Sequence, residues 1–455
     1  MADCSIERTI LGLPGVVLHS SLHDTSDAAG WGQRISRSGL QSRGSVLGRG
    51  AVRTAGRLDG PASWRRLAVL VLLGTIGGVS LWSVVVILPS VQAEFAVARG
   101  GASLPYTLTL IGFGIGGVLM GRAADRFGVF TPVIFGAVVL CVGYIAAGFA
   151  ATLWQFLLAH AVLIGLLGSS ATFAPLVADV SHWFVRRRAL AVAICACGNY
   201  FAGVVWPPVV EHFVQVVGWR RTEIGIGVAC LVTMVPLAFA LRSRPPEDSG
   251  VPGARPAAAP ARLSLSPNAV QALLVIAGVA CCVAMAMPQV HIVAYCGDLG
   301  YGPARGAEML SLMLGFGVVS RVASGFIADR IGGLRTLLLG STLQMVALLL
   351  YLGFNGLASL YVISALFGLF QGGIVPSYAI IVREYFAPQE AGVRVGVVLM
   401  ATLIGMALGG WLSGAIFDLT GSYRAAFANG VLWNLLNLAI AAWLLWRGRQ
   451  RSAFA

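Results

Sequence analysis

Twelve long apolar runs occupy most of this sequence, and each is long enough to cross a membrane. Their approximate spans are 66–90, 101–120, 130–151, 154–179, 189–211, 223–242, 268–293, 304–327, 334–354, 357–381, 394–416 and 425–446. A helix crosses the ~30 Å hydrocarbon core of a bilayer in about 20 residues. Only 11% of the 455 residues are charged, against about 25% in soluble domains. The sequence therefore predicts an all-α membrane protein with twelve transmembrane helices.

A segment rich in proline, alanine and glycine separates the first six runs from the last six. We expect it to be a flexible cytoplasmic linker because it has charge but no apolar period. The N-terminal segment is rich in serine, glycine and arginine, which favours disorder. The predicted division is a disordered tail over 1–64, a six-helix bundle over 65–243, the linker over 244–266, a second six-helix bundle over 267–447 and a C-terminal tail over 448–455.

All basic residues are arginines, and their distribution indicates how the chain is inserted. If the N-terminus is cytoplasmic, the outer loops hold Arg99, Arg220, Arg221, Arg305 and Arg424. With these five and the intramembrane Arg321 set aside, 25 of the 31 arginines fall on the cytoplasmic side. Such an excess is typical of cytoplasmic loops. We therefore expect both termini inside, and the net charge of +13 needs no nucleic acid partner.

Glycine is frequent, with 58 residues, and several glycines recur four residues apart within predicted spans. The pairs are Gly112 with Gly116, Gly117 with Gly121, Gly405 with Gly409, and Gly410 with Gly414. Small residues at this spacing let membrane helices approach closely. We interpret these pairs as helix-packing positions.

The two halves of the chain repeat a loop motif. "GRAADRFG" at 121–128 follows the second span and "GFIADRIG" at 325–332 follows the eighth, with five of eight positions identical. This repeat predicts two pseudo-symmetric bundles. We expect Gly121 and Gly325 to allow close packing, and the motif aspartates to cap a helix N-terminus. The adjacent arginines can pair with an acid of the other bundle or with lipid head groups; the alternative is a charge pair that only solvates the loop.

Twelve helices in a six-plus-six repeat, with G-x-x-x-D-R-x-G after the second and the eighth, resemble the major facilitator superfamily over residues 66–447. The resemblance implies the major facilitator fold and a loop that helps to lock the outward-facing state. We assign that conformational gating role to the motif residues and to a candidate partner at the start of the eleventh helix. These residues are Gly121, Asp125, Arg126, Gly128, Gly325, Asp329, Arg330 and Arg394.

Arg321 lies inside the eighth span, eight residues before Asp329. At 1.5 Å per residue it is ~12 Å from the cytoplasmic edge, where a charge costs at least ~2.5 kcal/mol. We expect none of the 18 acids at that depth; Glu223 is expected to be external, and Glu308 lies ~20 Å away along the same helix. The missing counterion is then an anionic cargo. The alternative is an arginine whose side chain snorkels to the cytoplasmic face.

Other polar residues in the predicted spans can complete a substrate site around Arg321. They are Gln289, His291 and Tyr295 on the seventh helix, Tyr106 on the second, Asn199 and Tyr200 on the fifth, and Gln371 and Tyr378 on the tenth. Each alone is more easily a hydrogen bond between helices than a ligand group.

Within the superfamily, the chain resembles the monocarboxylate porter and oxalate/formate antiporter group. The similar stretches are "EFAVARGGASLPYTL", "WFVRRRALAVAICACGNYFAG", "HIVAYCGDLG" and the arginine of the eighth helix. In this group that arginine binds the substrate carboxylate, and Arg321 stands at its position. The sequence departs in two ways: Gly317 replaces the aspartate of eukaryotic members, and the usual lysine of the first or eleventh helix is missing, with Ser83 near the first of these positions. The missing second cation argues against a dicarboxylate.

The sequence therefore predicts a secondary transporter of small monocarboxylates in a bacterial inner (plasma) membrane, most simply a monomer. His291 is the candidate proton carrier, and proton symport is placed only slightly above uniport or antiport. The alternatives are an efflux porter for drugs or metabolites and a transporter-like membrane sensor. No cofactor or metal is expected. We also do not expect an enzyme, because the sequence has no nucleotide-binding glycine loop and no nucleophile–base pair at recognisable spacing.

Overall fold

The computed structural model describes residues 58–184, 186–243 and 265–452, which belong to one compact unit. Twelve helices in these ranges are long and apolar enough to span a membrane, as the sequence predicted. Most of the predicted tail and nearly all of the predicted linker lie outside the described residues. The first helix begins at Pro61 and the last ends at Ser452, so each extends a few residues beyond the predicted bundle limits.

Eight spans are single helices, and four are divided into shorter helices. The single ones are α5 (Arg99–Phe127), α6 (Phe130–Gly148), α11 (Trp219–Phe239), α12 (Pro267–Asp298), α13 (Pro303–Ile331), α14 (Gly333–Gly353), α17 (Pro388–Thr420) and α18 (Tyr423–Ser452). The first span comprises α2 (Pro61–Gly77) and α3 (Val79–Val86), followed by α4 (Leu88–Glu94). The fourth comprises α7 (Leu153–Leu158), the π-helix η1 (Ala159–Gly168), the 3₁₀-helix η2 (Ser169–Thr172) and α8 (Ala174–Trp183). The fifth comprises α9 (Arg188–Ala196) and α10 (Gly198–Val217), and the tenth α15 (Leu357–Gln371) and α16 (Ile374–Tyr385).

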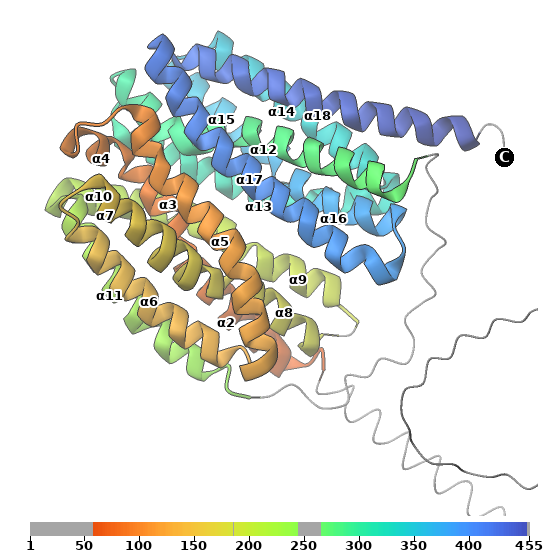
Figure 1. Cartoon of the computed structure of the whole chain (residues 1–455), viewed down its shortest axis with the longest axis horizontal. Helices are drawn as coiled ribbons and strands as arrows, with labels where there is room; N and C mark the ends of the chain where they lie inside the picture. The colour runs from red at the N-terminus through yellow and green to blue at the C-terminus, as the bar shows by residue number, and fades with distance from the viewer. Residues whose placement is uncertain (1–57, 185, 244–264, 453–455) are drawn as a thin grey trace, which may run out of the picture. The chain divides into compact units, whose positions relative to one another are not determined.

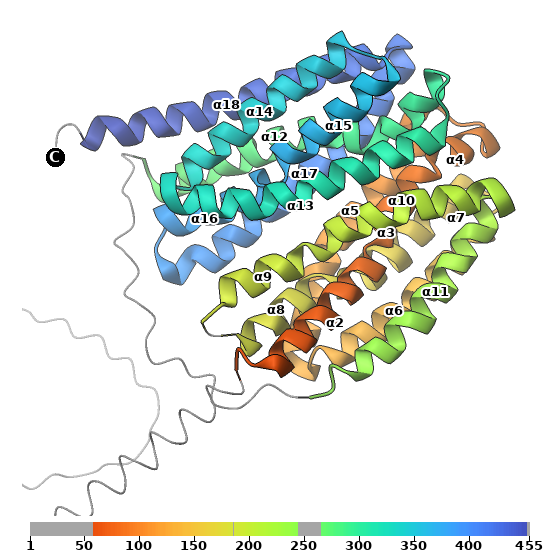
Figure 2. The ribbon, with the colours of Figure 1, turned by 180° about the vertical axis from the view of Figure 1, so that it is seen from behind.

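The helices form two bundles that meet along two seams. Helix α5 packs against α17, as Figure 1 shows, and α10 packs against α13, as Figure 2 shows. These are the second span with the eleventh and the fifth with the eighth. Adding six to the second span gives the eighth, and subtracting six from the eleventh gives the fifth, so the two pairs are equivalent under the repeat. The seams therefore have the two-fold relation that the repeated loop motif predicted.

Glycine pairs make the close approaches within and between the bundles. A Cβ on Gly405 or Gly409 would lie 2.5 Å from a carbonyl oxygen of α12, and one on Gly414 would lie 2.9 Å from the carbonyl oxygen of Arg99 on α5. The packing predicted for the α17 glycines is therefore confirmed. On α5 the prediction holds for Gly112 and Gly116, which approach the η1 backbone.

The second predicted pair on α5 does not make such an approach, and this gives a matched test of packing. A Cβ on Gly116 would lie 1.9 Å from the Leu166 carbonyl oxygen, whereas one on Gly117 meets nothing closer than 3.7 Å. We expect Gly116→Ala to destabilise the protein by about 1–3 kcal/mol, because a backbone oxygen cannot move aside as a flexible side chain can. Gly117→Ala is expected to be neutral or mildly stabilising. Thermal unfolding of both purified variants checks this, and equal melting points would contradict it.

The glycines of the repeated loop motif have a different structural role from the one expected. Gly128 and Gly332, its last residues, adopt φ angles of 77° and 84° with ψ angles of 162° and 161°, a backbone region that is essentially restricted to glycine. A Cβ on Gly121 or Gly325 would meet no described atom within 4 Å beyond its chain neighbours and its own helix backbone, so the close packing expected there is absent from this conformation.

The expected aspartate caps are also missing from the described loops. Helices α6 and α14, which follow the two motifs, have no side-chain cap from the residue before them. The N-terminus of α14 is instead capped by Glu384 at the end of α16, whose Oε1 accepts a hydrogen bond of 2.9 Å from Gly333 N–H. A carboxylate distant in sequence therefore does what was predicted for Asp329, which is exposed.

Candidate functional site

Arg321 of α13 lies half-buried at the seam between the bundles, where α9 and α15 end. Its Nη1 donates to the carbonyl oxygen of Ala196 at 3.2 Å, and its Nε donates to that of Gly372 at 3.4 Å. Ala196 is the last residue of α9, and Gly372 directly follows α15. Carbonyls at helix C-termini carry a partial negative charge. One half-helix from each bundle thus helps to offset the charge of the guanidinium.

Tyr200 of α10 covers one face of the same guanidinium, with the ring centroid 4.2 Å from Arg321 Cζ. This cation–π contact adds a further stabilising interaction. A Cβ on Gly317 would lie 2.5 Å from Tyr200 Cε1. The tyrosine ring thus occupies the space that a longer side chain at 317 would need, which explains why glycine stands there.

The guanidinium keeps hydrogen-bonding capacity for a ligand. Within the described ranges no carboxylate lies within 4 Å of Arg321, and its hydrogen bonds use Nε and Nη1. Arginine has five N–H donors in a planar fork, and two parallel donors match a carboxylate. The donor groups end on carbonyls between the bundles, which does not fit the snorkelling alternative. The dipoles reduce the need for a mobile counterion, but they leave the formal positive charge in place.

Three other predicted residues lie on the helices around this arginine. Gln289 Nε2 donates to Gln371 Oε1 at 2.7 Å, and both side chains are buried. Gln371 directly precedes Gly372, and its Nε2 has no partner among the described residues. Asn199 precedes Tyr200, and its buried Oδ1 also lacks one. These amides have unused capacity, although the two glutamines are engaged with each other in this conformation.

The remaining predicted residues lie elsewhere. His291 is fully buried; its Nε2 is 2.8 Å from the Gly410 carbonyl and its Nδ1 3.3 Å from Tyr423 Oη. Tyr106 packs where a Cβ on Gly410 would come within 3.0 Å. Tyr295 lines a pocket of about 320 Å³. This pocket lies at the end of the molecule that carries the predicted outer loops, which we call the arginine-poor end. Tyr378 donates to Asn437 Oδ1 inside the C-terminal bundle. Their substrate-binding roles stay predictions.

A cluster that the sequence did not predict joins the bundles at the arginine-poor end. The Arg99 guanidinium contacts Asp298 at 2.9 Å and donates to Tyr423 Oη at 2.6 Å. Asp418 accepts hydrogen bonds of 2.7 Å from the backbone N–H groups of Arg99 and Gly100. The carboxylate thereby caps the N-terminus of α5 from the opposite bundle. This cluster, which we call the clasp, closes that end.

Among the described residues, the loop motif at the arginine-rich end forms no ion-pair cluster comparable to the clasp. The motif residues Asp125, Arg126, Asp329 and Arg330 are exposed. Arg394, their candidate partner, contacts Glu390 one turn earlier at 2.8 Å. The gating pair predicted between the motif and Arg394 is therefore not formed in this conformation, and the assignment stays a prediction.

Two acids near helix ends are buried inside the protein. Glu223 was expected outside the membrane, yet its side chain is fully buried, and its Oε2 lies 3.4 Å from Nε2 of the equally buried His160. Glu211 is also buried and hydrogen-bonds Gln215. Bundle packing covers these residues although each lies near a helix end. A histidine inside an apolar run was the one sequence signal for the first pair.

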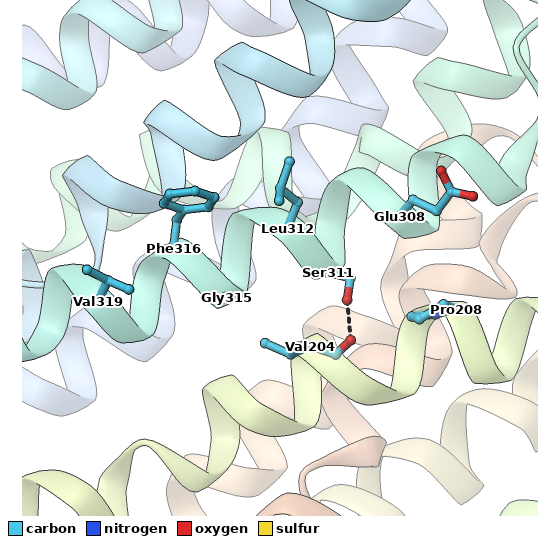
Figure 3. Close-up of a pocket in the computed structure, with 8 residues that line it drawn as sticks. All are labelled: Val204, Pro208, Glu308, Ser311, Leu312, Gly315, Phe316 and Val319. Atoms are coloured by element: carbon cyan, nitrogen blue, oxygen red, sulfur yellow. Dashed lines mark hydrogen bonds between the residues drawn. The ribbon is translucent and has the colours of Figure 1, made fainter.

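A lateral hollow of about 440 Å³ lies where α10 meets α13 (Figure 3). Its lining is mainly apolar, including Val204, Leu312 and Phe316. The Ser311 hydroxyl is already bonded to the Val204 carbonyl, and Glu308 contacts Arg305. The hollow therefore offers few free polar groups, and Arg321 is a better candidate centre for a charged ligand.

Comparisons with protein families, curated proteins and solved structures all identify membrane transporters. A family model described as Major Facilitator Superfamily matches residues 70–352 and 309–454. Monocarboxylate transporter 13 of Bos taurus is 29% identical, covering 72% of this chain and 75% of the relative. The agnestins efflux protein AgnL12 of Paecilomyces divaricatus is 24% identical, covering 64% and 67%. The solved structure of a bacterial homologue of the human lysosomal transporter Spinster, inward-facing and occupied, is 13% identical with a TM-score of 0.66, covering 86% and 97%. These matches confirm the superfamily and the fold that the sequence resembled.

Proposed function

Because this chain belongs to the Major Facilitator Superfamily, we propose that it is a secondary transporter of small organic anions, in particular monocarboxylates, with Arg321 binding the carboxylate. The observation that carries the proposal is the position of Arg321. It lies between the bundles and donates hydrogen bonds to a backbone carbonyl of each. In the described part of the chain it has no carboxylate within 4 Å. Bundles that rock about such a residue expose a bound anion to one side and then to the other.

The charge around Arg321 supports one carboxylate rather than two. Ala196, Gly372 and Tyr200 contribute dipoles and a ring face rather than a second cation. A dicarboxylate would bring an additional negative charge to these partial negative charges. A planar monocarboxylate can instead accept two N–H bonds from the guanidinium and neutralise it.

The clasp indicates which state the structure represents. If both termini are cytoplasmic, as the arginine distribution predicts, the Arg99–Asp298–Asp418 cluster closes the outer side. The exposed motif residues then lie on the inner side, and the conformation is inward-facing. The two relatives named above by sequence identity come from an animal and a fungus, so a bacterial inner membrane stays a prediction from the sequence.

Export of an organic acid is the second candidate, because one relative is named as an efflux protein. It uses the same arginine and differs in the direction of flux. Transport assays in both orientations of the membrane distinguish uptake from export.

The test is uptake of labelled pyruvate or lactate by proteoliposomes that contain the purified protein. We expect saturable uptake that unlabelled monocarboxylates inhibit, weaker inhibition by malonate, and none by lactamide, which lacks the carboxylate charge. Liposomes without protein are the control. Equal inhibition by lactate and lactamide would contradict carboxylate recognition, and the absence of uptake for every acid tested would reject the cargo class.

A further inference from the structure

The buried pair of His160 and Glu223 has no role in the function proposed so far. His160 lies on the π-helix η1 of the fourth span and Glu223 on α11, the sixth span. Both side chains are fully buried, with His160 Nε2 3.4 Å from Glu223 Oε2. Irregular π-helical turns occur frequently at functional sites. A buried acid beside a buried base is costly unless protons and hydrogen bonds balance it.

The hydrogen bonds around this pair leave room for one proton between the two side chains. The Thr109 hydroxyl donates to the Pro105 carbonyl at 2.7 Å, so its lone pairs can accept from His160 Nδ1, 3.4 Å away. In the tautomer that carries its hydrogen on Nδ1, the Thr109 oxygen accepts this hydrogen and Nε2 faces Glu223 without one. Neither His160 Nε2 nor either Glu223 oxygen has a hydrogen-bond partner within the described ranges. One proton between Nε2 and the carboxylate would satisfy both groups.

Charge balance favours the same state. With one shared proton the pair is neutral overall, whether the proton is on the imidazole or on the carboxyl group. Without it, a buried carboxylate would face a neutral imidazole and would have no hydrogen-bond partner within the described ranges. The site can therefore hold one proton, between His160 Nε2 and Glu223 Oε2.

The described residues around the pair supply no competing charge. Helix α7 contributes the Phe156 ring, 4.4 Å from the His160 ring, and α6 contributes Tyr144, whose hydroxyl bonds Ser83. The further titratable groups on these helices are the thiol of Cys230 on α11, which lies near Tyr144, and that of Cys141 on α6, which lies near Cys230. Towards the arginine-poor end, Arg220 of α11 is already paired with Glu94. In the described residues, no second acid or arginine lies within ion-pair distance of the two groups.

We propose that His160 and Glu223 form a proton-binding site that couples transport to the proton gradient. The inference rests on the proposed function, because the coupled step moves one carboxylate with one proton and is electrically neutral. The carboxylate binds at Arg321, and the proton binds between His160 Nε2 and Glu223; no bond of the cargo changes. His291, the candidate from sequence, has its ring nitrogens directed at Gly410 and Tyr423 rather than at an acid.

Helix α5 provides a physical link from the pair to the bundle interface. Its Thr109 contacts His160, and its Thr107 hydroxyl donates to the Ala407 carbonyl of α17 across the seam at 3.0 Å. A protonation change that reorients the imidazole therefore acts on a helix that faces the other bundle. This gives the proton a route to affect which state is favoured.

Proton binding is tested directly by pH-difference infrared spectroscopy on the purified full chain between about pH 5 and about pH 8, the range in which histidine sites titrate. We expect a carboxyl band that titrates in wild type, disappears in Glu223→Gln and shifts in His160→Gln. His212→Gln, at an exposed histidine of α10, is the matched control and keeps the band. A spectrum without any titrating band removed by Glu223→Gln would overturn the site.

Coupling is tested in proteoliposomes with labelled lactate. A one-to-one symporter accumulates its cargo up to about tenfold for a gradient of one pH unit. We expect wild type and His212→Gln to show this accumulation. Glu223→Gln and His160→Gln should lose it while retaining exchange of labelled for unlabelled lactate, which needs no net proton movement. Accumulation in Glu223→Gln equal to wild type would overturn coupling through this pair, as would gradient-independent uptake in wild type. A titrating band with no lactate transport at all would reject the proposed cargo and leave the proton site standing.

Discussion

Replacing Arg321 by alanine is expected to lower carboxylate uptake by about 100-fold or more. The substitution removes the charged hydrogen bonds that a guanidinium gives to a carboxylate, each worth about 1.5–3 kcal/mol. It also leaves the carbonyls of Ala196 and Gly372 without their donor. Uptake of labelled lactate per folded protein in proteoliposomes measures the effect, and size-exclusion chromatography establishes that the variant is folded.

Two further variants separate charge from geometry at this position. Arg321→Lys keeps a cation but loses the planar fork and the Tyr200 stacking, so we expect an intermediate loss, seen first as a higher KM. Arg335→Ala removes an exposed arginine of α14 and is expected to leave KM unchanged. If Arg321→Ala transported lactate with the wild-type KM and rate, carboxylate binding by this residue would be disproved.

Replacing Arg66 by alanine is expected to cause the largest loss of stability, about 3–5 kcal/mol. Arg66 of α2 binds Asp179 of α8 through two bonds of 2.7 and 2.8 Å, and both side chains are buried. Its guanidinium also donates to the Leu241 carbonyl and lies 4.4 Å from the centroid of the Trp183 ring. The substitution strands a buried carboxylate where three segments of the N-terminal bundle meet. Thermal unfolding of the purified protein measures the loss.

The neighbouring residue offers a matched control. Arg65 is exposed, and Arg65→Ala is expected to change stability by less than about 0.5 kcal/mol. The double variant Arg66→Met with Asp179→Leu is expected to recover most of the loss, because replacing both partners by apolar groups leaves no stranded charge. Equal melting points for the Arg65 and Arg66 variants would show that the buried pair contributes little.

Most of the fold was predictable because bilayer thickness limits how a chain can cross it. Twelve apolar runs gave twelve helices, and the repeated loop motif gave the relation between the bundles. The sequence showed that a glycine ends each copy of the motif. The structure gives the reason: the two glycines adopt φ angles of 77° and 84°. The glycine pairs of α5 were only half predictable, since spacing does not tell which glycine faces a neighbour: Gly116 does and Gly117 does not.

The candidate site was predictable in its central residue and less so in its surroundings. A permanently charged side chain in an apolar run is visible in sequence because lipid penalises it. That it contacts Tyr200, and carbonyls at the ends of α9 and α15, depends on where helices break. His291 and Tyr295 share a helix face as expected, yet that face leads to the clasp and to a separate pocket. The substrate roles of these two residues remain predictions.

By itself the sequence determined that the chain spans a membrane twelve times in two equivalent halves, and that one of its spans carries an arginine. Hydrophobicity, length and repetition are properties of local segments, so they can be read along the chain. Only the tertiary structure decided which charges meet: Arg66 with Asp179, Arg99 with Asp298, and His160 with Glu223. These partners are far apart in the sequence, and burial of each pair comes from helices that pack together only in the folded bundle.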